Sequence, residues 1–355
     1  MVNLLIRRLD KEEFEPYLVC LDRGGVFHEQ TANLCAGSYI LERRPGPFDS
    51  QLFWRLVSLL RKNKIDIIHS HNGCSSYAVL AGKLAGVKSI IHTDHGRLVP
   101  DKKSAQIEDR LSSCFMDKFI GVSEDLSEYL GSTIGINRKR LMTIINGVDT
   151  DIFRPRTASE RSELRSILGL GDQDKVIGTV CRLDPVKNLE FMISCIPSIV
   201  NRIPDAKLII VGDGPAGCAL KLLVDKLQLK GVVSFLGQKE NVENILPAFD
   251  VYACSSLSEG TSMTILEAMA CGLPIVASAV GGNVRLVDHR NGVLFPLGDH
   301  TSFIQGVVSI LQQSERSLRL GAAGRAIVEA DLNLSSCIRR YDALYHTVCS
   351  VKNAN

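Results

Sequence analysis

The sequence predicts an α/β protein made of two doubly wound domains. Short apolar runs with strand character alternate with longer stretches of helical periodicity, and this rhythm favours parallel sheets covered by helices. The 355 residues suit two domains of ordinary size, each able to bury its own core. In such sheets ligands bind at the carboxyl ends of the strands, so polar residues at those ends are the candidates for function.

The composition is that of a globular protein, with 45% hydrophobic and 23% charged residues. A net charge of +2 is too small for a nucleic-acid-binding surface, so we expect no nucleic-acid partner. No apolar run reaches the roughly 20 residues of a membrane span, and the first residues lack the pattern of a signal peptide. The eleven cysteines include no C-x-x-C pair, which favours reduced thiols in a cytoplasmic protein.

In the first half, short apolar runs predict strands at 17–21, 38–41, 65–69, 89–93, 119–122 and 141–145. Helices are expected at 1–9, 49–62, 75–85 and, capped by Ser123, at 123–130. Histidines lie at or near several strand ends: His69, His71, His92 and His95. A metal site is disfavoured because histidines alternating along strands would face opposite sides, and no H-E-x-x-H spacing occurs.

The segment 43–64 is rich in basic side chains, namely Arg43, Arg44, Arg55, Arg61, Lys62 and Lys64. One interpretation is a peripheral contact with a membrane surface. The alternative is a solvated helix face over an ordinary core, which surface helices commonly present.

In the second half, strands are expected at 176–181, 207–211, 232–236, 250–254, 275–277 and 293–295. Helices are expected at 160–168, 262–271, 299–311, 314–330 and about 334–348.

The most informative stretch follows the strand at 250–254. A loop with serine and glycine leads into the helix that starts at Ser262, and the loop and helix carry Glu259 and Glu267. Free backbone N–H groups at the helix start suit a phosphate, and the carboxylates can accept hydrogen bonds from sugar hydroxyls. This combination indicates a nucleotide-sugar, unless Glu259 is a surface loop residue and Glu267 an ordinary helix-face glutamate.

Arg182 and Lys187 lie at the end of the strand at 176–181 and the start of the next helix. Two cations so placed can converge on one diphosphate, Arg182 by its planar fork and Lys187 as a point charge. The alternative is surface salt bridging to Asp184 or Glu190.

Residues Gly212 to Gly217 satisfy the pattern G-x-G-x-x-G. A dinucleotide fingerprint should open the first strand-helix unit of a domain, and an acidic residue should end the next strand. This motif opens the second unit, and Gly237 and Gln238 end the next strand. We therefore expect Gly212 and Gly214 to let the backbone approach a nucleotide, with an NAD(P)-dependent oxidoreductase as the alternative.

The string that contains Glu259 and Glu267 continues with Ala-Met-Ala at 268–270 and Gly-x-Pro at 272–274. This pattern resembles the signature of the retaining GT-B glycosyltransferases of family four, the glycosyl transferases group 1. The strings Gly-Val-Ser-Glu at 121–124, Asn-Gly-Val-Asp at 146–149 and 182–188 are similar to the same family.

The resemblance implies a GT-B fold, in which two doubly wound Rossmann-like domains face each other across a cleft. The acceptor-side domain would comprise 1–154 and a final helix of about 334–355 that packs back onto it. The nucleotide-sugar-binding domain would comprise 155–333. Asn146 and Gly147 tolerate a turn where the chain leaves the first sheet, so the linker is expected near 150–159.

The implied reaction moves a sugar from a nucleotide-diphosphate sugar to an acceptor, a glycan or lipid-linked glycan, with retention of anomeric configuration. No metal or other cofactor is expected, because cations of the protein would neutralise the leaving group. The catalytic residues would be His95, Arg182, Lys187 and Glu259. The donor would also be bound by Asn188, Gly212, Gly214, Gly260, Thr261, Ser262, Met263, Thr264 and Glu267.

Relative to the family, the first strand and its glycine loop are missing, since the sequence opens inside the first helix at 1–9. That strand lies in the middle of a doubly wound sheet, so we expect the sheet to close over a gap. Either the start codon is assigned too far downstream or the protein is a truncated form. A truncated form could be catalytically impaired and bind only the donor.

Overall fold

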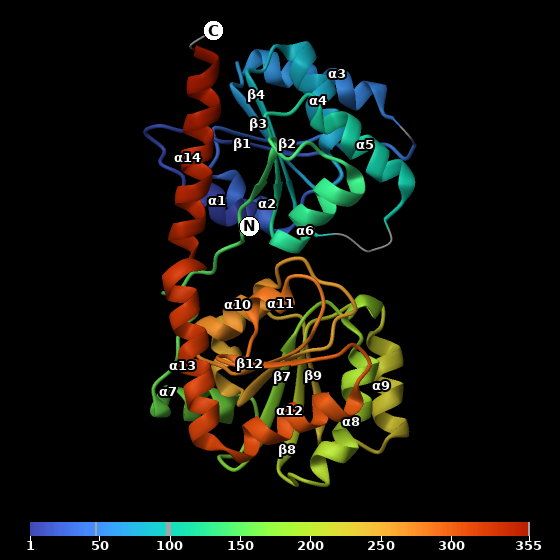
Figure 1. The fold of residues 1–355 in the computed structure, drawn as a ribbon, viewed down its shortest axis with the longest axis vertical. Helices are drawn as coiled ribbons and strands as arrows, with labels where there is room; N and C mark the ends of the chain where they lie inside the picture. Colours follow the sequence, from blue (N-terminus) through green and yellow to red (C-terminus); the bar gives the residue numbers. More distant parts are fainter. Residues whose placement is uncertain (47, 97–100, 354–355) are drawn as a thin grey trace. The chain divides into compact units, whose positions relative to one another are not determined.

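A computed structural model describes residues 1–46, 48–96 and 101–353. The chain forms two units (Figure 1). Unit 1 comprises Met1–Asn146 together with the chain from Ser336 onward, and unit 2 comprises Gly147–Ser335.

Unit 2 contains one sheet whose six described strands are all parallel, in the order β12-β11-β10-β7-β8-β9. Read from β9, this is third, second, first, fourth, fifth and sixth in chain order, as is typical of a doubly wound fold. The strands are β7 Lys175–Val180, β8 Ala206–Val211, β9 Val233–Gly237, β10 Val251–Cys254, β11 Ile275–Ser278 and β12 Gly292–Phe295.

The helices of unit 2 cover both faces of this sheet. They are α7 Ala158–Ile167, α8 Leu189–Val200, α9 Gly217–Lys226, α10 Met263–Ala270, α11 Asn283–Leu286, α12 His300–Gln312 and α13 Ser314–Asp331, with 3-10 turns η2 Pro185–Lys187, η3 Val242–Asn244 and η4 Leu246–Ala248. Neighbouring residues of the central strand β7 face opposite cores, since Ile177 packs with α8 and α12 while Val176 packs with α10. Burial on both faces explains why these strands read as continuous apolar runs.

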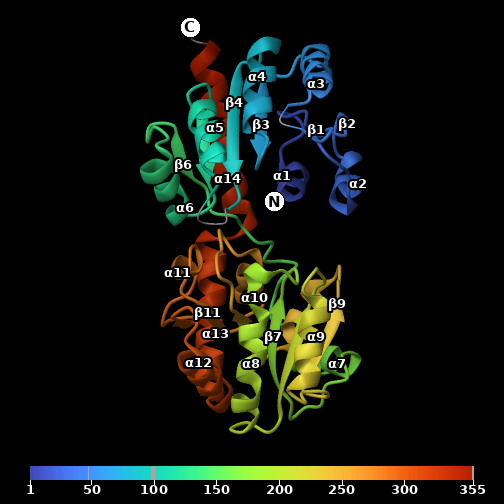
Figure 2. The same ribbon diagram turned by 90° about the vertical axis from the view of Figure 1, so that its right-hand side faces the viewer.

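Unit 1 holds a four-stranded parallel sheet, β3-β4-β5-β6, and a separate parallel pair, β1-β2, among its described residues (Figure 2). The strands are β1 Tyr17–Cys20, β2 Gly37–Ile40, β3 Ile67–His71, β4 Ser89–Asp94, β5 Lys118–Gly121 and β6 Leu141–Thr143. The helices are α1 Val2–Arg8, α2 Val26–Ala32, α3 Ser50–Lys62, α4 Ser75–Ala85, α5 Lys103–Ser113, α6 Glu124–Tyr129, the π-helix η1 Leu130–Ile134 and α14 Leu334–Asn353.

The last helix, α14, belongs mostly to unit 1. Its Tyr341 and Tyr345 are buried against Ile91 and Ile120 of the four-stranded sheet. The Ser89 hydroxyl donates to the Val348 carbonyl at 3.1 Å.

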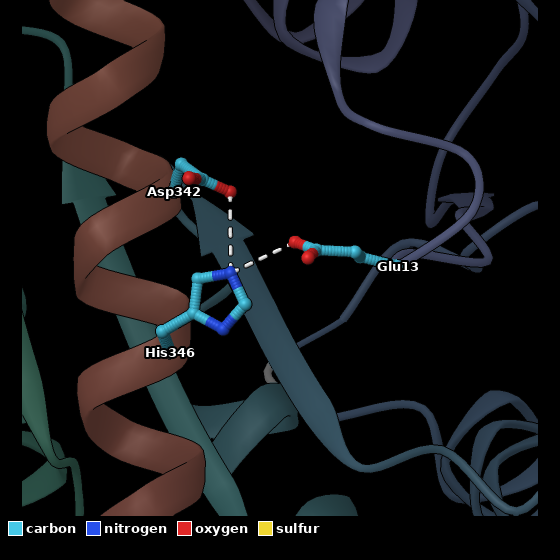
Figure 3. A group of neighbouring side chains, drawn as sticks. All are labelled: Glu13, Asp342 and His346. Atoms are coloured by element: carbon cyan, nitrogen blue, oxygen red, sulfur yellow. Dashed lines mark hydrogen bonds and ion pairs between the residues drawn. The ribbon is translucent and has the colours of Figure 1, made fainter.

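A small polar cluster fastens the loop after α1 to α14 (Figure 3). His346 Nε2 lies 3.0 Å from Glu13 Oε2 and 3.7 Å from Asp342 Oδ1, and Phe14 packs beside the same imidazole. The exposed Glu13 and His346 and the half-buried Asp342 form a tie within unit 1.

The boundary between the units lies a few residues before the predicted end of the first domain at 154. Main-chain groups hold this segment to unit 2, because Arg325 Nη1 and Nη2 donate to the carbonyls of Phe153 and Thr150. Val148 also forms a bridge with Asn333. Residues 147–154 therefore pack as part of unit 2 instead of acting as a free linker.

Candidate functional site

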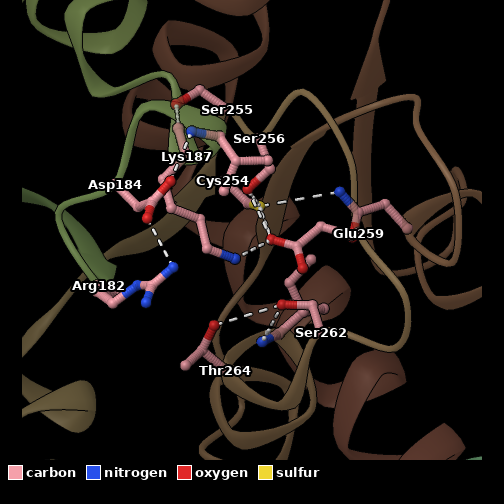
Figure 4. A network of polar contacts seen from close by, with 12 residues as sticks. Arg182, Asp184, Lys187, Cys254, Ser255, Ser256, Glu259, Ser262 and Thr264 are labelled. Carbon is pink, nitrogen blue, oxygen red and sulfur yellow. Dashed lines mark hydrogen bonds and ion pairs between the residues drawn. The ribbon is translucent and has the colours of Figure 1, made fainter. Parts of the chain in front are cut away.

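The predicted site of unit 2 lies on two loops at the carboxyl ends of β7 and β10 (Figure 4). These strands are neighbours, although one is the first strand of the unit and the other the fourth. The loops touch, because Ser255 Oγ donates to the carbonyls of Lys187 at 2.9 Å and Asn188 at 3.0 Å. The point where the strand order reverses is where doubly wound sheets bind ligands.

Lys187 and Glu259 meet across these two loops. Lys187 Nζ lies 2.6 Å from Glu259 Oε1, and the two side chains are only 25% and 11% exposed. Ser256 Oγ donates to the same carboxylate oxygen at 2.6 Å. Burial by itself would lower the pKa of Lys187, but the charge of Glu259 and the hydrogen bond to it raise that pKa overall. The ammonium group therefore keeps its positive charge at this strand edge.

Arg182 lies on the same loop as Lys187 but has a different partner. Its Nη2 is 2.6 Å from Asp184 Oδ2, and its side chain is 71% exposed. The alternative of a salt bridge to Asp184 is therefore present in the structure. An exposed pair of this kind contributes about 0–1 kcal/mol, so a diphosphate could displace it at little cost.

The helix that starts beside Glu259 is α10, which was expected to begin at about Ser262, and Ser262 caps it. Its hydroxyl accepts from the Ile265 N–H at 3.4 Å. Thr264 Oγ1 accepts from the Tyr252 hydroxyl at 2.7 Å, and that wholly buried hydroxyl also reaches the Val180 carbonyl. The start of α10 is thereby fastened to the ends of β7 and β10.

Two glycines hold the Glu259 loop in place. A Cβ at Gly281 would overlap the carbonyl oxygen of Glu259, and one at Gly282 would overlap that of Gly260. The Gly282 N–H also donates to the Glu259 carbonyl at 3.2 Å. Only a residue without a side chain allows this approach of two main chains.

Glu267 follows in the second turn of α10. Burial, with a smaller contribution from Glu243, raises the pKa of this carboxyl to about 7. No hydrogen-bond or ion-pair partner for it lies among the residues that the structure describes. A carboxylate in this setting would gain from a ligand that donates hydroxyl hydrogens.

Close contacts with the main chain of a neighbouring loop explain why residues 212 and 214 are glycines. A Cβ at Gly212, where φ is +130°, would overlap the Cys181 carbonyl oxygen. A Cβ at Gly214 would lie 2.6 Å from the Leu183 carbonyl oxygen. They press against the loop that bears Arg182 and Lys187, so their role toward a nucleotide stays a prediction.

His95 lies in unit 1, just after β4. Its ring nitrogen Nε2 is 2.9 Å from His71 Nδ1. Its main-chain N–H donates to Asn72 Oδ1. Burial lowers the pKa of His95 to about 4, so its imidazole is neutral near pH 7.

The expectation that the strand histidines face opposite sides is wrong for His69 and His71. They are two residues apart within β3, which extends to His71, so they share one face with ring centroids 4.2 Å apart. Both ring nitrogens of His69 are hydrogen-bonded, to the hydroxyls of Tyr345 and Thr93. These hydrogen bonds account for the position of His69. His92 lies apart from them, beside Phe119.

Several cations of the basic segment 43–64 are held by the protein. Arg43 binds both oxygens of Asp22, and Arg55 and Arg61 donate to the carbonyls of Leu41 and Leu84. In the described part of the chain, no helix is long and apolar enough to cross a membrane. A peripheral membrane contact stays a prediction.

The fold and the site together define a class of protein. Two parallel, doubly wound units, one with cations and a capped helix start at its switch point, are typical of proteins that bind phosphate-bearing nucleotides.

Comparison with known proteins identifies the family. The model for Glycosyltransferase Family 4 matches residues 1–152, and that for Glycosyl transferases group 1 matches residues 160–327. The chain therefore belongs to the family 4 glycosyltransferases and has their GT-B fold. Membership of this family of enzymes sets the oxidoreductase alternative aside.

Relatives cover most of the chain. It is 31% identical over 322 residues to the Escherichia coli UDP-Gal:alpha-D-GlcNAc-diphosphoundecaprenol alpha-1,3-galactosyltransferase, covering 85% of this chain and 81% of that enzyme. It is 27% identical over 329 residues to the Bacillus anthracis N-acetyl-alpha-D-glucosaminyl L-malate synthase, covering 91% and 84%. The crystal structure of Anabaena Alr3699/HepE in complex with UDP matches with a TM-score of 0.85 at 21% identity, covering 98% and 94%.

Proposed function

We propose that this protein transfers a sugar from a nucleotide-diphosphate sugar to a glycan or lipid-linked glycan acceptor, with retention of anomeric configuration. The observation that carries the proposal is the meeting of Lys187 and Glu259 at the switch point, beside the start of α10. A cation, a helix start and a carboxylate together suit a diphosphate attached to a hydroxyl-rich sugar.

The names of the relatives support a nucleotide-sugar donor. The Escherichia coli enzyme is named for UDP-Gal and a lipid-linked acceptor, and the Anabaena structure contains UDP. We therefore propose UDP-sugars as the first donors to test.

The Lys187–Glu259 pair suggests how the donor would enter. The diphosphate would take the place of Glu259 as the anionic partner of Lys187, and Glu259 would then be free to accept hydrogen bonds from the donor sugar. Arg182 would leave Asp184 for the same diphosphate. As the nucleoside diphosphate departs, its growing negative charge would be stabilised by Lys187, Arg182 and the amides around Gly260. This proposal requires no metal.

The other predicted residues have supporting roles in this proposal. Glu267 would accept from the ribose hydroxyls, and the segment from Thr261 to Thr264 would present the helix start to the diphosphate. His95 is proposed as a contact to the donor sugar. It would act as a neutral hydrogen-bonding group, because the pKa of its imidazole is about 4.

The proposal is tested by separating donor binding from turnover. The protein is incubated with a panel of UDP- and GDP-sugars, thermal stabilisation is measured, and transfer to lipid-linked and free glycans is then assayed with the stabilising donors. Lys187→Ala is expected to reduce transfer about 10²–10³-fold. The matched control is Lys230→Ala, whose side chain forms an exposed pair with Asp225.

Thermal unfolding of Lys187→Ala, measured without donor, distinguishes loss of the site from loss of the fold. Unchanged transfer in a folded Lys187→Ala protein would contradict the site. Donor binding without turnover in the unmodified chain would favour the alternative of a catalytically impaired form.

A further inference from the structure

The two carboxylate oxygens of Glu259 have different surroundings (Figure 4). Oε1 accepts from Lys187 Nζ and from Ser256 Oγ, each at 2.6 Å. Among the residues that the structure describes, Oε2 has no hydrogen bond or ion pair. One oxygen is therefore engaged within the protein, and the other keeps its capacity to accept.

The side of the carboxylate that carries Oε1 has little access to water. Glu259, Ser256 and Lys187 line a cavity of about 10 Å³, a volume that holds one water molecule at most. The side chain of Glu259 is 11% exposed, and Ser256 is 1% exposed. A carboxylate in such a place needs hydrogen bonds from the protein, because burying a charge without partners is costly.

Ser256 is held in place from two sides. Its carbonyl accepts from the hydroxyl of Ser278, the last residue of β11, at 2.7 Å. Its neighbour Ser255 donates to the carbonyls of Lys187 and Asn188 on the β7 loop. A serine hydroxyl also ends a short side chain, whereas the lysine ammonium ends a long flexible stem. Ser256 is therefore the more rigid of the two donors to Glu259.

The proposed function takes one of these two donors away. Lys187 would turn from Glu259 to the diphosphate of the donor. The other contact to Oε1 in the described part of the chain is the Cys254 thiol, which is a weak donor and lies 4.0 Å away. The direction of the carboxylate would then depend on Ser256.

We propose that Ser256 is a positioning residue for sugar transfer, which holds Oε1 of Glu259 so that Oε2 accepts from a hydroxyl of the donor sugar. Ser256 acts through Glu259 and touches no reacting atom. This role rests on the proposed function, and it adds a residue that the sequence pattern did not single out.

The alternative is a serine that only supports the loop. Removing such a residue would affect every nucleotide and every donor sugar alike. A positioning residue affects only those ligands that carry the hydroxyl from which Glu259 accepts. The two roles therefore differ in how the effect of a substitution depends on the ligand.

The test compares Ser256→Ala with the unmodified chain. The ligands are the UDP- or GDP-sugar that stabilises the protein most and the matching free UDP or GDP. Ser256→Cys is the second variant, because a thiol fills the space that water could enter but donates weakly. The matched control is Ser309→Ala, whose half-buried hydroxyl donates to the Gly306 carbonyl within α12. Calorimetry gives the affinities, and thermal unfolding without ligand shows whether each variant is folded.

Both Ser256 variants are expected to reduce transfer about 10–100-fold, while the affinity for free UDP or GDP stays within about twofold. Donor analogues that carry hydrogen in place of one sugar hydroxyl at a time locate the contact. With one of them the unmodified chain should lose the same factor, and Ser256→Ala should cause no further loss. The Ser309→Ala control should match the unmodified chain throughout.

The role of Ser256 is overturned if the folded variants transfer as fast as the unmodified chain, or if they bind free UDP or GDP equally weakly. It is also overturned if the loss is the same with every deoxy donor, because Ser256 would then only support the loop. Should the unmodified chain bind a donor without turnover, its affinity relative to free UDP or GDP tests the same contact. If the unmodified chain binds no nucleotide-sugar, the proposed function fails and this role fails with it.

Discussion

Unit 2 and unit 1 follow the same strand order but differ at the first strand. In unit 2, β7 contributes Ile177 to the core on one face and Val176 and Val180 to the core on the other. In unit 1 the same position is a cavity between two helix layers. The comparison teaches that the central strand of a doubly wound sheet connects two cores, so its absence opens the interior instead of trimming an edge.

The candidate functional residues also differ between the two units. The loop after β7 carries Arg182 and Lys187, and the glycines after β8 press against it. In unit 1 no described strand occupies the equivalent position, and the histidines of β3 lie beside the cavity instead. A complete central strand is therefore what positions the candidate site of unit 2.

The largest expected effect comes from the close contact of two main chains in unit 2. Gly282→Val would force the Gly281–Gly282 turn away from Gly260, and we expect a loss of about 3 kcal/mol in the free energy of unfolding, with donor-induced stabilisation lost. Chemical denaturation with and without UDP-sugars measures both. The control is Gly171→Ala, whose added Cβ would meet only the Asp174 carboxylate at ordinary contact distance. Near-equal stabilities would contradict the tight contact.

The second prediction contrasts the two units by pH. Glu267 in unit 2 has a folded pKa of about 7 against a usual 4.5, so the unfolded chain loses this proton first as the pH rises. Its stabilising contribution is present below pH 4.5 and is lost as the pH rises through 7. The loss amounts to about 3 kcal/mol, and Glu267→Gln should remove it.

Unit 1 is expected to respond in the opposite direction. Burial lowers the pKa of His69 to about 3 and that of His95 to about 4, against a usual 6.5. The unfolded chain therefore takes up protons first as the pH falls below 6.5, and unit 1 loses stability on acidification. Hydrogen exchange resolved by unit at pH 5 and pH 8 checks both directions, and parallel responses of the two units would contradict them.

The smallest expected effect concerns packing at the central strand β7 of unit 2 and beside the cavity of unit 1. Ile177→Phe enlarges a fully buried side chain in the packed core of unit 2, and we expect a cost of about 1–3 kcal/mol in the free energy of unfolding. Ile67→Phe places the same change beside the cavity of unit 1, where there is room, and we expect a change within about 0.5 kcal/mol. Equal costs in denaturant unfolding would show that the cavity is not open in solution.

Much of the local structure could be predicted because it depends on neighbouring residues. The helix Met263–Ala270 was expected from an apolar pattern at helical spacing, and the cap at Ser123 was expected from a serine before such a pattern. The helix Ser75–Ala85 matches its expected range. The helix Lys103–Ser113 was not expected, because its polar sequence has no strong apolar periodicity.

The strand at 65–69 was placed too early, since β3 runs from Ile67 to His71. Two histidines ended the apolar run in the sequence. In the structure His69 is satisfied by Tyr345 of α14, a partner distant in the chain. Local patterns carry no information about such a partner.

The candidate site was partly predictable because residue type and position at a strand end are local features of the sequence. Arg182, Lys187 and Glu259 were identified by residue type at strand ends, while Ser256 and Tyr252 were not. Their importance arises only when the β7 and β10 loops meet. A serine three residues before a strand-end glutamate was the one available signal.

The sequence by itself determined the two doubly wound units and the strand-end positions of the cations and carboxylates. These follow from periodicity, capping and residue type, which act over a few residues. Only the tertiary structure decided that Glu259 pairs with Lys187, that burial raises the pKa of Glu267 to about 7, and that an apolar cavity lies between β1 and β3. Charge pairing, desolvation and packing depend on neighbours that folding brings together from distant parts of the chain.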